Sequence, residues 1–152
     1  MNPPLPLPVV KPRRDQLKPG ESLCDHCTGK CCRYFSTPID TPSTWDDYDA
    51  IRWYLAHDLT LVYVHEETWY LLVSTNCRYL LDDHRCAIYD DRPKICREYT
   101  TKDCEYDDDW DFDKVFESPE QVWEYAEALL PPRRKPPERA GLGLLPIVTP
   151  PS

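Results

Sequence analysis

The sequence has little positive charge, little glycine and no long apolar run. Its 18 Lys and Arg stand against 27 Asp and Glu, which gives a formal net charge of −9. Nucleic-acid binding depends on clustered Lys and Arg that displace counterions from phosphates, and anionic lipid surfaces attract basic segments. No stretch reaches the roughly 20 apolar residues of a membrane span. We therefore expect no nucleic-acid partner and no membrane partner.

The motifs of several common enzyme classes and of exported proteins are also missing. The chain has 4 glycines and no Gly-rich nucleotide loop, and it contains neither H-E-x-x-H nor G-x-S-x-G. Its start, "MNPPLPLPVVKPRRD", lacks the basic region and apolar core of a secretory signal. We therefore expect a cytoplasmic protein, in which thiols stay reduced. Whether it is an enzyme is left open by the sequence.

Cysteine, by contrast, is abundant. The stretch "CDHCTGKCCR" holds four cysteines, two of them adjacent, and a second group follows. Such a set can form a disulfide framework, a metal or iron–sulfur site, or reactive thiols. The C-x2-C spacing favours a shared metal, and neighbouring cysteines do not readily pair with each other. We predict that the metal ligands are all eight: Cys24, Cys27, Cys31, Cys32, Cys77, Cys86, Cys96 and Cys104.

Proline marks both ends of the chain. Many of the 17 prolines fall in residues 1–20 and 131–152, which lack any apolar periodicity. Such composition is typical of extended segments without a core. We predict two disordered Pro-rich tails over these ranges and one cysteine-cluster metal-binding domain over residues 21–130.

Three segments of this domain have clear secondary-structure signals. Residues 41–57 predict a helix capped by Thr41 or Thr44, and residues 59–74 predict two strands around a turn at 65–68. Residues 118–130 predict a helix with Ser118 as N-cap, Pro119 first, and Gln121 completing a capping box. Its expected apolar face comprises Val122, Trp123, Ala126 and either Leu129 or Leu130.

A shorter helix is expected around one of the later cysteines. Pro93 suits a first helical position, with Asp90 or Asp91 as the cap, so Cys96 is predicted to lie on this helix. The fold class predicted overall is a small α+β domain, irregular and metal-stabilised, with a β-hairpin and short helices around a cysteine cluster. Because the chain has only 3 Phe, we expect a modest core that relies on the metal.

The later cysteines lie in "CRYLLDDHRCAIYDDRPKICREYTTKDC", at intervals that let this segment fold back over the first group. Arginines stand next to cysteines or near them throughout, and a cluster of thiolates with one or two metals keeps negative charge that guanidinium groups offset. We predict this role for Arg33, Arg78, Arg85, Arg92 and Arg97. His26 and His84 are possible replacement ligands, although hydrogen-bonded histidine is the commoner situation.

The strings "CDHCTGKCC" and "CAIYDDRPKICREY" together resemble the YkgJ-type cysteine-cluster proteins, which are described as zinc- or iron-chelating domains. The resemblance covers residues 24–104. It implies that the eight cysteines form the family's set, with four companions: Tyr89, Arg92, Pro93 and Arg97. One departure is that three residues, not two, separate Cys27 from Cys31. The extra residue changes which of the two adjacent cysteines, Cys31 or Cys32, points at the residue with which Cys27 would share a metal.

Two functions are consistent with these observations. The first is a metal-binding protein that coordinates zinc or an iron–sulfur cluster through its eight cysteines, with an unidentified protein partner allowed. The second is an iron–sulfur enzyme or redox protein, since the resemblance extends to flagellin lysine methylases and so implies protein-lysine methyl transfer. A closed four-thiolate zinc site has no open position for a substrate, which favours the first function where zinc is bound.

Overall fold

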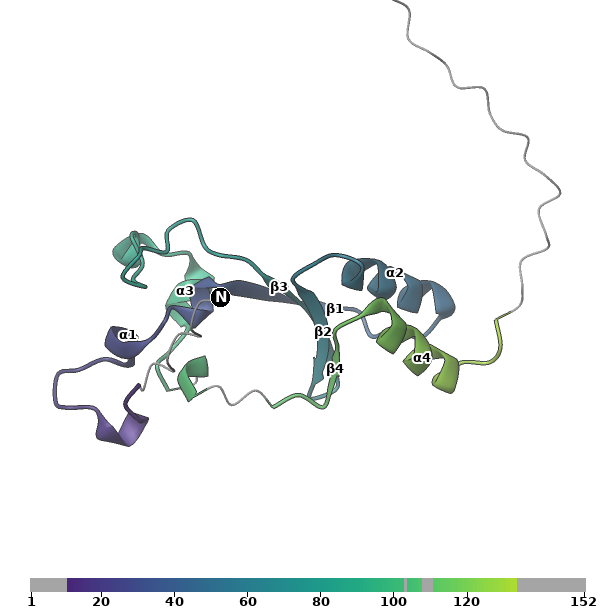
Figure 1. Cartoon of the computed structure of the whole chain (residues 1–152), viewed down its shortest axis with the longest axis horizontal. Coiled ribbons are helices and arrows are strands. Elements are labelled where there is room, and N and C mark those ends of the chain that lie inside the picture. The colour runs from purple at the N-terminus through teal and green to yellow at the C-terminus, as the bar shows by residue number, and fades with distance from the viewer. Residues whose placement is uncertain (1–10, 103, 108–110, 134–152) are drawn as a thin grey trace, which may run out of the picture.

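The computed structural model describes residues 11–102, 104–107 and 111–133. A four-stranded antiparallel sheet lies between a pair of helices, α2 and α4, and the segments that carry the cysteines (Figure 1). Its strand order is β1-β3-β2-β4, with β1 at Tyr34–Ile39, β2 at Thr60–His65, β3 at Thr68–Ser74 and β4 at Lys114–Phe116. The helices are α1 at Leu23–His26, α2 at Trp45–Leu55, α3 at Lys94–Glu98 and α4 at Pro119–Leu129. The predicted α+β class is confirmed.

The β2–β3 hairpin has the predicted turn. His65 pairs with Thr68, and the two residues between them, Glu66 and Glu67, have φ of 47° and 65°. Two positive φ angles in succession define a type I′ turn, whose twist matches that of the flanking strands. Residues other than Gly, Asn and Asp rarely occupy both positions, so this turn is conformationally strained.

Helix α2 begins at a complete capping box. The Thr44 hydroxyl accepts a hydrogen bond from the Asp47 amide, and the Asp47 carboxylate accepts one from the Thr44 amide at 2.9 Å. This arrangement satisfies amide donors that the first helical turn leaves unpaired. Of the two predicted caps, Thr44 is therefore the one used, and the helix ends at Leu55, two residues before the predicted limit.

Helix α4 begins as predicted but differs in two details. Ser118 accepts from the Gln121 amide, and Pro119 occupies the first turn. The predicted capping box is wrong, because the Gln121 side chain accepts instead from the Glu117 amide at 2.6 Å. The predicted apolar face is confirmed at Val122, Ala126 and Leu130, whereas Leu129 is 57% exposed. Tyr125, which was not predicted on this face, also packs against the core.

The core lies between helices α2 and α4 and one face of the sheet. Its buried members are Tyr48, Ile51, Leu55, Val62, Val64, Trp69, Phe116, Val122 and Ala126. The Trp69 and Phe116 rings stack at 5.5 Å with an interplanar angle of 7°. None of the eight cysteines belongs to this cluster. Burial of apolar surface here therefore stabilises the helix pair and sheet without direct help from the thiols.

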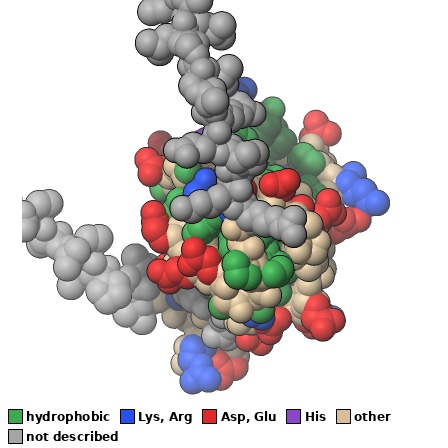
Figure 2. Space-filling view, turned by 90° about the vertical axis from the view of Figure 1, so that its right-hand side faces the viewer, with side chains coloured by type: hydrophobic (Ala, Val, Ile, Leu, Met, Phe, Trp, Pro, Cys, Tyr) green, Lys and Arg blue, Asp and Glu red, His purple; other side chains and the backbone are tan. Residues whose placement is uncertain are grey.

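The outer surface of the α2–α4 end is acidic. Figure 2 shows this end, where Asp and Glu side chains outnumber Lys and Arg around a small area of exposed apolar side chains. The exposed apolar residues of α2 and α4 include Trp53 and Leu129. Within the described part of the chain, none of the helices has both the length and the apolar character needed to cross a membrane.

Candidate metal centre

All eight cysteines are free thiols, and they lie in the segments at the opposite end of the sheet from α2 and α4 (Figure 1). The predicted tails lie largely outside the described residues, at 1–10 and 134–152. Residues 11–20 are described, and they include the short 3-10 helix η1 at Arg14–Gln16. The domain boundaries stay a prediction.

The first cysteine group is shaped by two short helices. Ser22 and Asp25 form a capping box that starts α1, which carries Cys24. The chain then turns at Gly29, whose φ of 72° is left-handed, into the 3-10 helix η2 at Lys30–Cys32. A Cβ at Gly29 would lie 2.9 Å from Leu80 Cδ1 and 3.2 Å from the His84 carbonyl oxygen. Glycine is therefore required both for the backbone angle and for the close approach of the later segment.

Residues 77–87 form the part of the second group that packs against the first. The Cys77 amide donates to the Cys32 carbonyl at 2.7 Å. The chain then turns, so that Leu80 and Cys86 form an isolated antiparallel bridge while the Leu80 amide donates to the Cys77 carbonyl at 3.2 Å. These backbone bonds hold Cys32, Cys77 and Cys86 at one corner of the molecule.

Side chains also join the two segments. Arg85 forms an ion pair with Asp25 at 2.9 Å. Arg33 donates to the Thr28 carbonyl at 2.9 Å, and its Nη2 lies 3.0 Å from His84 Nδ1. The prediction that residues 77–104 fold back over the first group is confirmed for residues 77–87. His84 is hydrogen-bonded in this arrangement.

The predicted arginine shell differs from the observed contacts. Arg33 and Arg85 bind the partners just described, and Arg92 donates to the Tyr89 carbonyl and stacks over its ring. An arginine that contacts a cysteine is Arg14, from the segment predicted as a tail. Its Nη2 donates to the Cys104 carbonyl at 2.8 Å and lies 3.6 Å from the Cys104 sulfur.

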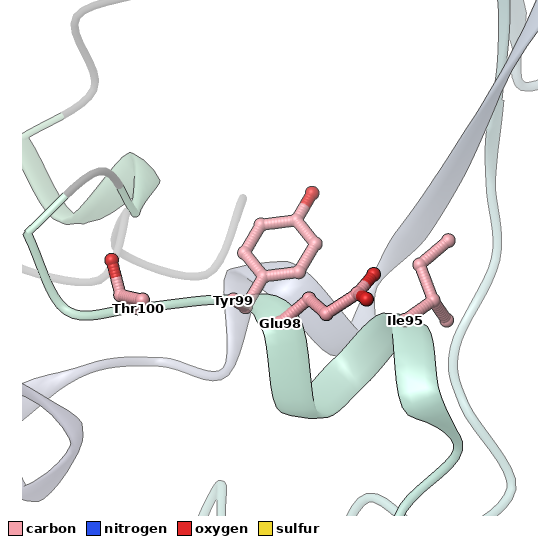
Figure 3. A pocket seen from close by; sticks show the side chains of 4 residues that line it. All are labelled: Ile95, Glu98, Tyr99 and Thr100. Atoms are coloured by element: carbon pink, nitrogen blue, oxygen red, sulfur yellow. The ribbon is translucent and has the colours of Figure 1, made fainter.

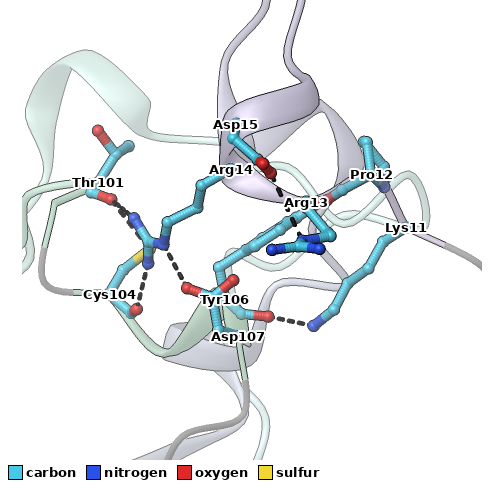
Figure 4. A network of polar contacts seen from close by, with 9 residues as sticks. All are labelled: Lys11, Pro12, Arg13, Arg14, Asp15, Thr101, Cys104, Tyr106 and Asp107. Atoms are coloured by element: carbon cyan, nitrogen blue, oxygen red, sulfur yellow. Dashed lines mark hydrogen bonds and ion pairs between the residues drawn. The ribbon is translucent and has the colours of Figure 1, made fainter.

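Arg14 is the centre of a wider polar network (Figure 4). Its guanidinium also donates to Asp107 and to the Thr101 carbonyl. The neighbouring Tyr106 is 2% exposed and donates to the Pro12 carbonyl at 2.6 Å. Sequence reasoning missed Arg14 because it lies 90 residues from Cys104 and carries no local motif.

The thiols of the two groups are electrostatic neighbours. Burial, with smaller contributions from the thiols of Cys32, Cys27 and Cys24, raises the pKa of Cys31 to about 12. Burial also raises the pKa of Cys32. A hydrogen bond from Cys31 opposes that shift, while thiols of the second group add to it: Cys77, Cys86 and Cys96. Negative charge on Cys31 and on Cys32 is therefore disfavoured unless a cation is present.

Cys96 lies on α3, as predicted, but the start of that helix differs. Pro93 is the N-cap itself, and Asp90 and Asp91 form the separate 3-10 helix η3 at Tyr89–Asp91 without capping α3. A pocket of about 340 Å³ lies beside α3, lined by Ile95, Glu98, Tyr99 and Thr100 (Figure 3). No cysteine lines this pocket, but it lies beside the thiols: burial raises the pKa of its lining residue Tyr99, and the thiols of Cys31 and Cys96 add to that shift.

Comparison with known families agrees with this geometry. A family model described as "Putative zinc- or iron-chelating domain" matches residues 23–120, well over half of the chain. The chain belongs to the CxxCxxCC family. The match begins one residue before Cys24 and includes all eight cysteines. No curated protein and no solved structure matches the chain.

Membership of the CxxCxxCC family supports a metal-binding role, and the donor set suits it. Thiolates are the ligands that zinc and iron–sulfur clusters prefer. Within the described residues, no three Cys, His, Asp or Glu side chains are already placed to hold a metal ion. The backbone bond from Cys77 to Cys32 nevertheless brings the two cysteine groups together.

Proposed function

We propose that this CxxCxxCC domain binds zinc or iron through the thiolates of its cysteines. The observation that carries the proposal is the assembly of cysteines from two distant segments, held by the Cys77–Cys32 backbone bond and the Arg85–Asp25 ion pair. Nothing in the core requires this assembly, since the core contains no cysteine. The family description points to the same class of ligand.

A bound metal ion would stabilise the thiolates and cross-link the two segments. Each thiol must lose its proton to become a ligand, so binding releases protons and strengthens as pH rises. The raised pKa of Cys31 extends this dependence to higher pH, because its proton is held more tightly in the metal-free protein. The proposal also requires a reducing compartment, such as the cytoplasm, since oxidised thiols cannot bind the metal.

The finer choice is between zinc and an iron–sulfur cluster. Zinc in closed thiolate sites is structural, and it would make the cysteine end a rigid surface. An iron–sulfur cluster would supply electron-transfer chemistry and would support the enzyme or redox alternative, protein-lysine methyl transfer included. Anaerobic purification followed by visible absorption and elemental analysis distinguishes the two, because only the cluster is coloured and contains inorganic sulfide.

The test of the proposal uses matched variants of the whole chain. Metal content and thiol titration are measured on reduced, anaerobically purified protein. We expect stoichiometric metal in the wild type, close to eight free thiols after chelation under denaturing conditions without reductant, and the loss of at least one metal equivalent in Cys96→Ser. Arg52→Ala on α2, far from the thiols and paired with Asp49, should retain full metal content. Four disulfides in the unreduced protein, or a wild type without metal, would refute the proposal.

A further inference from the structure

A second pocket lies where residues 77–87 pack against the first cysteine group, and its volume is about 240 Å³. Its apolar lining consists of Leu80 and Leu81, and its polar lining of Arg33, Asn76, Asp82 and His84. Cys77 also lines the pocket, so a molecule bound there would lie beside the thiols. The metal-binding function proposed above makes no use of this pocket.

The Arg33 side chain is held by three acceptors in the described part of the chain, and none of these three is charged. Its Nε donates to the Thr28 carbonyl at 2.9 Å and its Nη1 to Asn76 Oδ1 at 3.4 Å. Its Nη2 lies 3.0 Å from His84 Nδ1. A guanidinium carries five N–H groups and stays protonated, so these contacts leave N–H groups for a ligand. They therefore fix the position of Arg33 without neutralising its positive charge.

Arg33 also determines which atoms its two side-chain partners can offer to a ligand. Because a guanidinium can only donate hydrogen bonds, His84 Nδ1 must be the acceptor, and the proton of the neutral ring is on Nε2. For the same reason the oxygen of the Asn76 amide faces Arg33, and the NH₂ group lies at the other end of the amide. Three side chains of the pocket lining thus carry N–H donors, and one of them is positively charged.

The backbone places His84 beside Arg33 by means of an uncommon conformation. His84 has a φ of 67°, a left-handed angle that residues other than glycine seldom adopt. Its amide donates to the Leu81 carbonyl at 2.9 Å. Its carbonyl oxygen lies close to Gly29, where an added Cβ would come within 3.2 Å of it. Such a conformation persists only where the surrounding structure imposes it, so the fold itself sets the position of this imidazole.

We propose that this pocket binds a small organic carboxylate beside the thiols. The donors of Arg33, His84 and Asn76 match the acceptor oxygens of a carboxylate, and the two leucines provide contacts for a short apolar chain. Asp82 lines the same pocket and repels the second charge of an anion such as the phosphate dianion. The volume is below the roughly 300–1,000 Å³ of sites for drug-sized ligands, which indicates a ligand of a few carbon atoms.

The first experiment titrates the full, reduced chain with sodium butyrate at constant ionic strength and follows the side-chain N–H signals of Arg33 and Asn76 by NMR. Both signals should shift and reach saturation together. Inorganic phosphate should bind more weakly than butyrate, and butylammonium should shift neither signal. Failure of butyrate to saturate the shifts, or phosphate binding as tight as that of butyrate, would overturn the inference. The titration needs no bound metal, so its outcome is independent of the proposed metal-binding function.

The second experiment separates ligand binding from a purely structural role of Arg33. Asn76→Asp converts an exposed amide into a carboxylate of the same shape, which would pair with Arg33 and repel an anion. Butyrate binding should be lost, while the midpoint of thermal unfolding should not fall. Arg33→Gln should weaken butyrate binding at least about tenfold. Arg78→Gln removes the same charge beside Cys77 but outside the pocket lining, so it should leave the affinity unchanged. Butyrate binding that survives Asn76→Asp, or that falls equally in the two arginine variants, would refute the assignment.

Discussion

Replacing Gly29 by alanine tests how closely the two cysteine segments must pack. Gly29 has φ 72° and ψ 39°, a left-handed conformation that costs an alanine about 1 kcal/mol. The new Cβ would also lie 2.9 Å from Leu80 Cδ1 and 3.2 Å from the His84 carbonyl oxygen. The Leu80 methyl can rotate away at a cost of about 1 kcal/mol. The His84 carbonyl belongs to the backbone, so residues 77–87 must shift.

The total expected loss is about 2 kcal/mol in the free energy of unfolding of the cysteine end, and the two components have different consequences. The cost of the left-handed backbone at residue 29 affects only the segment that carries the first cysteine group. The steric component displaces Cys77 and Cys86 from Cys32, so it should weaken metal binding. A cost of about 1 kcal/mol corresponds to about a fivefold weaker metal affinity, measured by competition with a chelator of known affinity.

Gly20→Ala is the matched control. Gly20 also has a positive φ, 90°, but a Cβ there would meet no atom within 4 Å. This variant should incur a backbone cost of similar size and leave the metal affinity unchanged. Equal metal affinities for Gly29→Ala and Gly20→Ala would show that the approach of residues 77–87 to Gly29 does not support the site.

Three further predictions concern the core, a helix cap and Arg14. Val122→Ala removes two methyl groups from a side chain with 0% exposure and should lower the free energy of unfolding in urea by about 2 kcal/mol, with metal content unchanged. Leu129→Ala on the exposed side of α4 should cost under about 0.5 kcal/mol. Similar losses in both variants would refute the core assignment. Hydrogen bonds from the amides of Ser43 and Thr44 and from the Thr44 hydroxyl lower the pKa of Asp47, so the stabilising contribution of its carboxylate should be complete above about pH 4 and disappear as pH falls further. The difference in thermal stability between wild type and Asp47→Asn should therefore shrink as pH falls below that value. A difference that stays constant would contradict this prediction. Arg14→Ala should weaken metal binding about 10–100-fold if Cys104 is a ligand, because the Arg14 guanidinium lies against the Cys104 sulfur. Competition with a chelator measures the metal affinity. An unchanged affinity would exclude Cys104 from the ligand set.

The location of the core changes what metal removal is expected to do. The composition predicted a domain that depends on the metal throughout, but the buried cluster between α2, α4 and the sheet contains no cysteine. We therefore expect chelation to expose the backbone amides of residues 24–33 and 77–99 to hydrogen exchange while those of β2, β3 and α4 remain protected. Loss of protection throughout would show that the metal supports the core as well.

Local patterns in the sequence determined most of the secondary structure. The N-cap at Thr44, the serine–proline start of α4 and the strand-forming residues on either side of residues 65–68 act over a few residues, so they can be recognised without tertiary contacts. The C-x2-C spacing likewise indicated the metal-binding family. Each of these signals depends only on residues that lie close together in the sequence.

Only the tertiary structure decided which distant residues meet. Arg14 contacts Cys104 across 90 positions, and Asp25 pairs with Arg85 across 60. The capping role expected of Asp90 and Asp91 failed because the chain forms η3 before Pro93 starts α3. Leu129 matched the helical period yet is 57% exposed at the last position of α4, whereas the next residue, Leu130, packs against the core. Such outcomes depend on how elements pack, which no short-range pattern encodes.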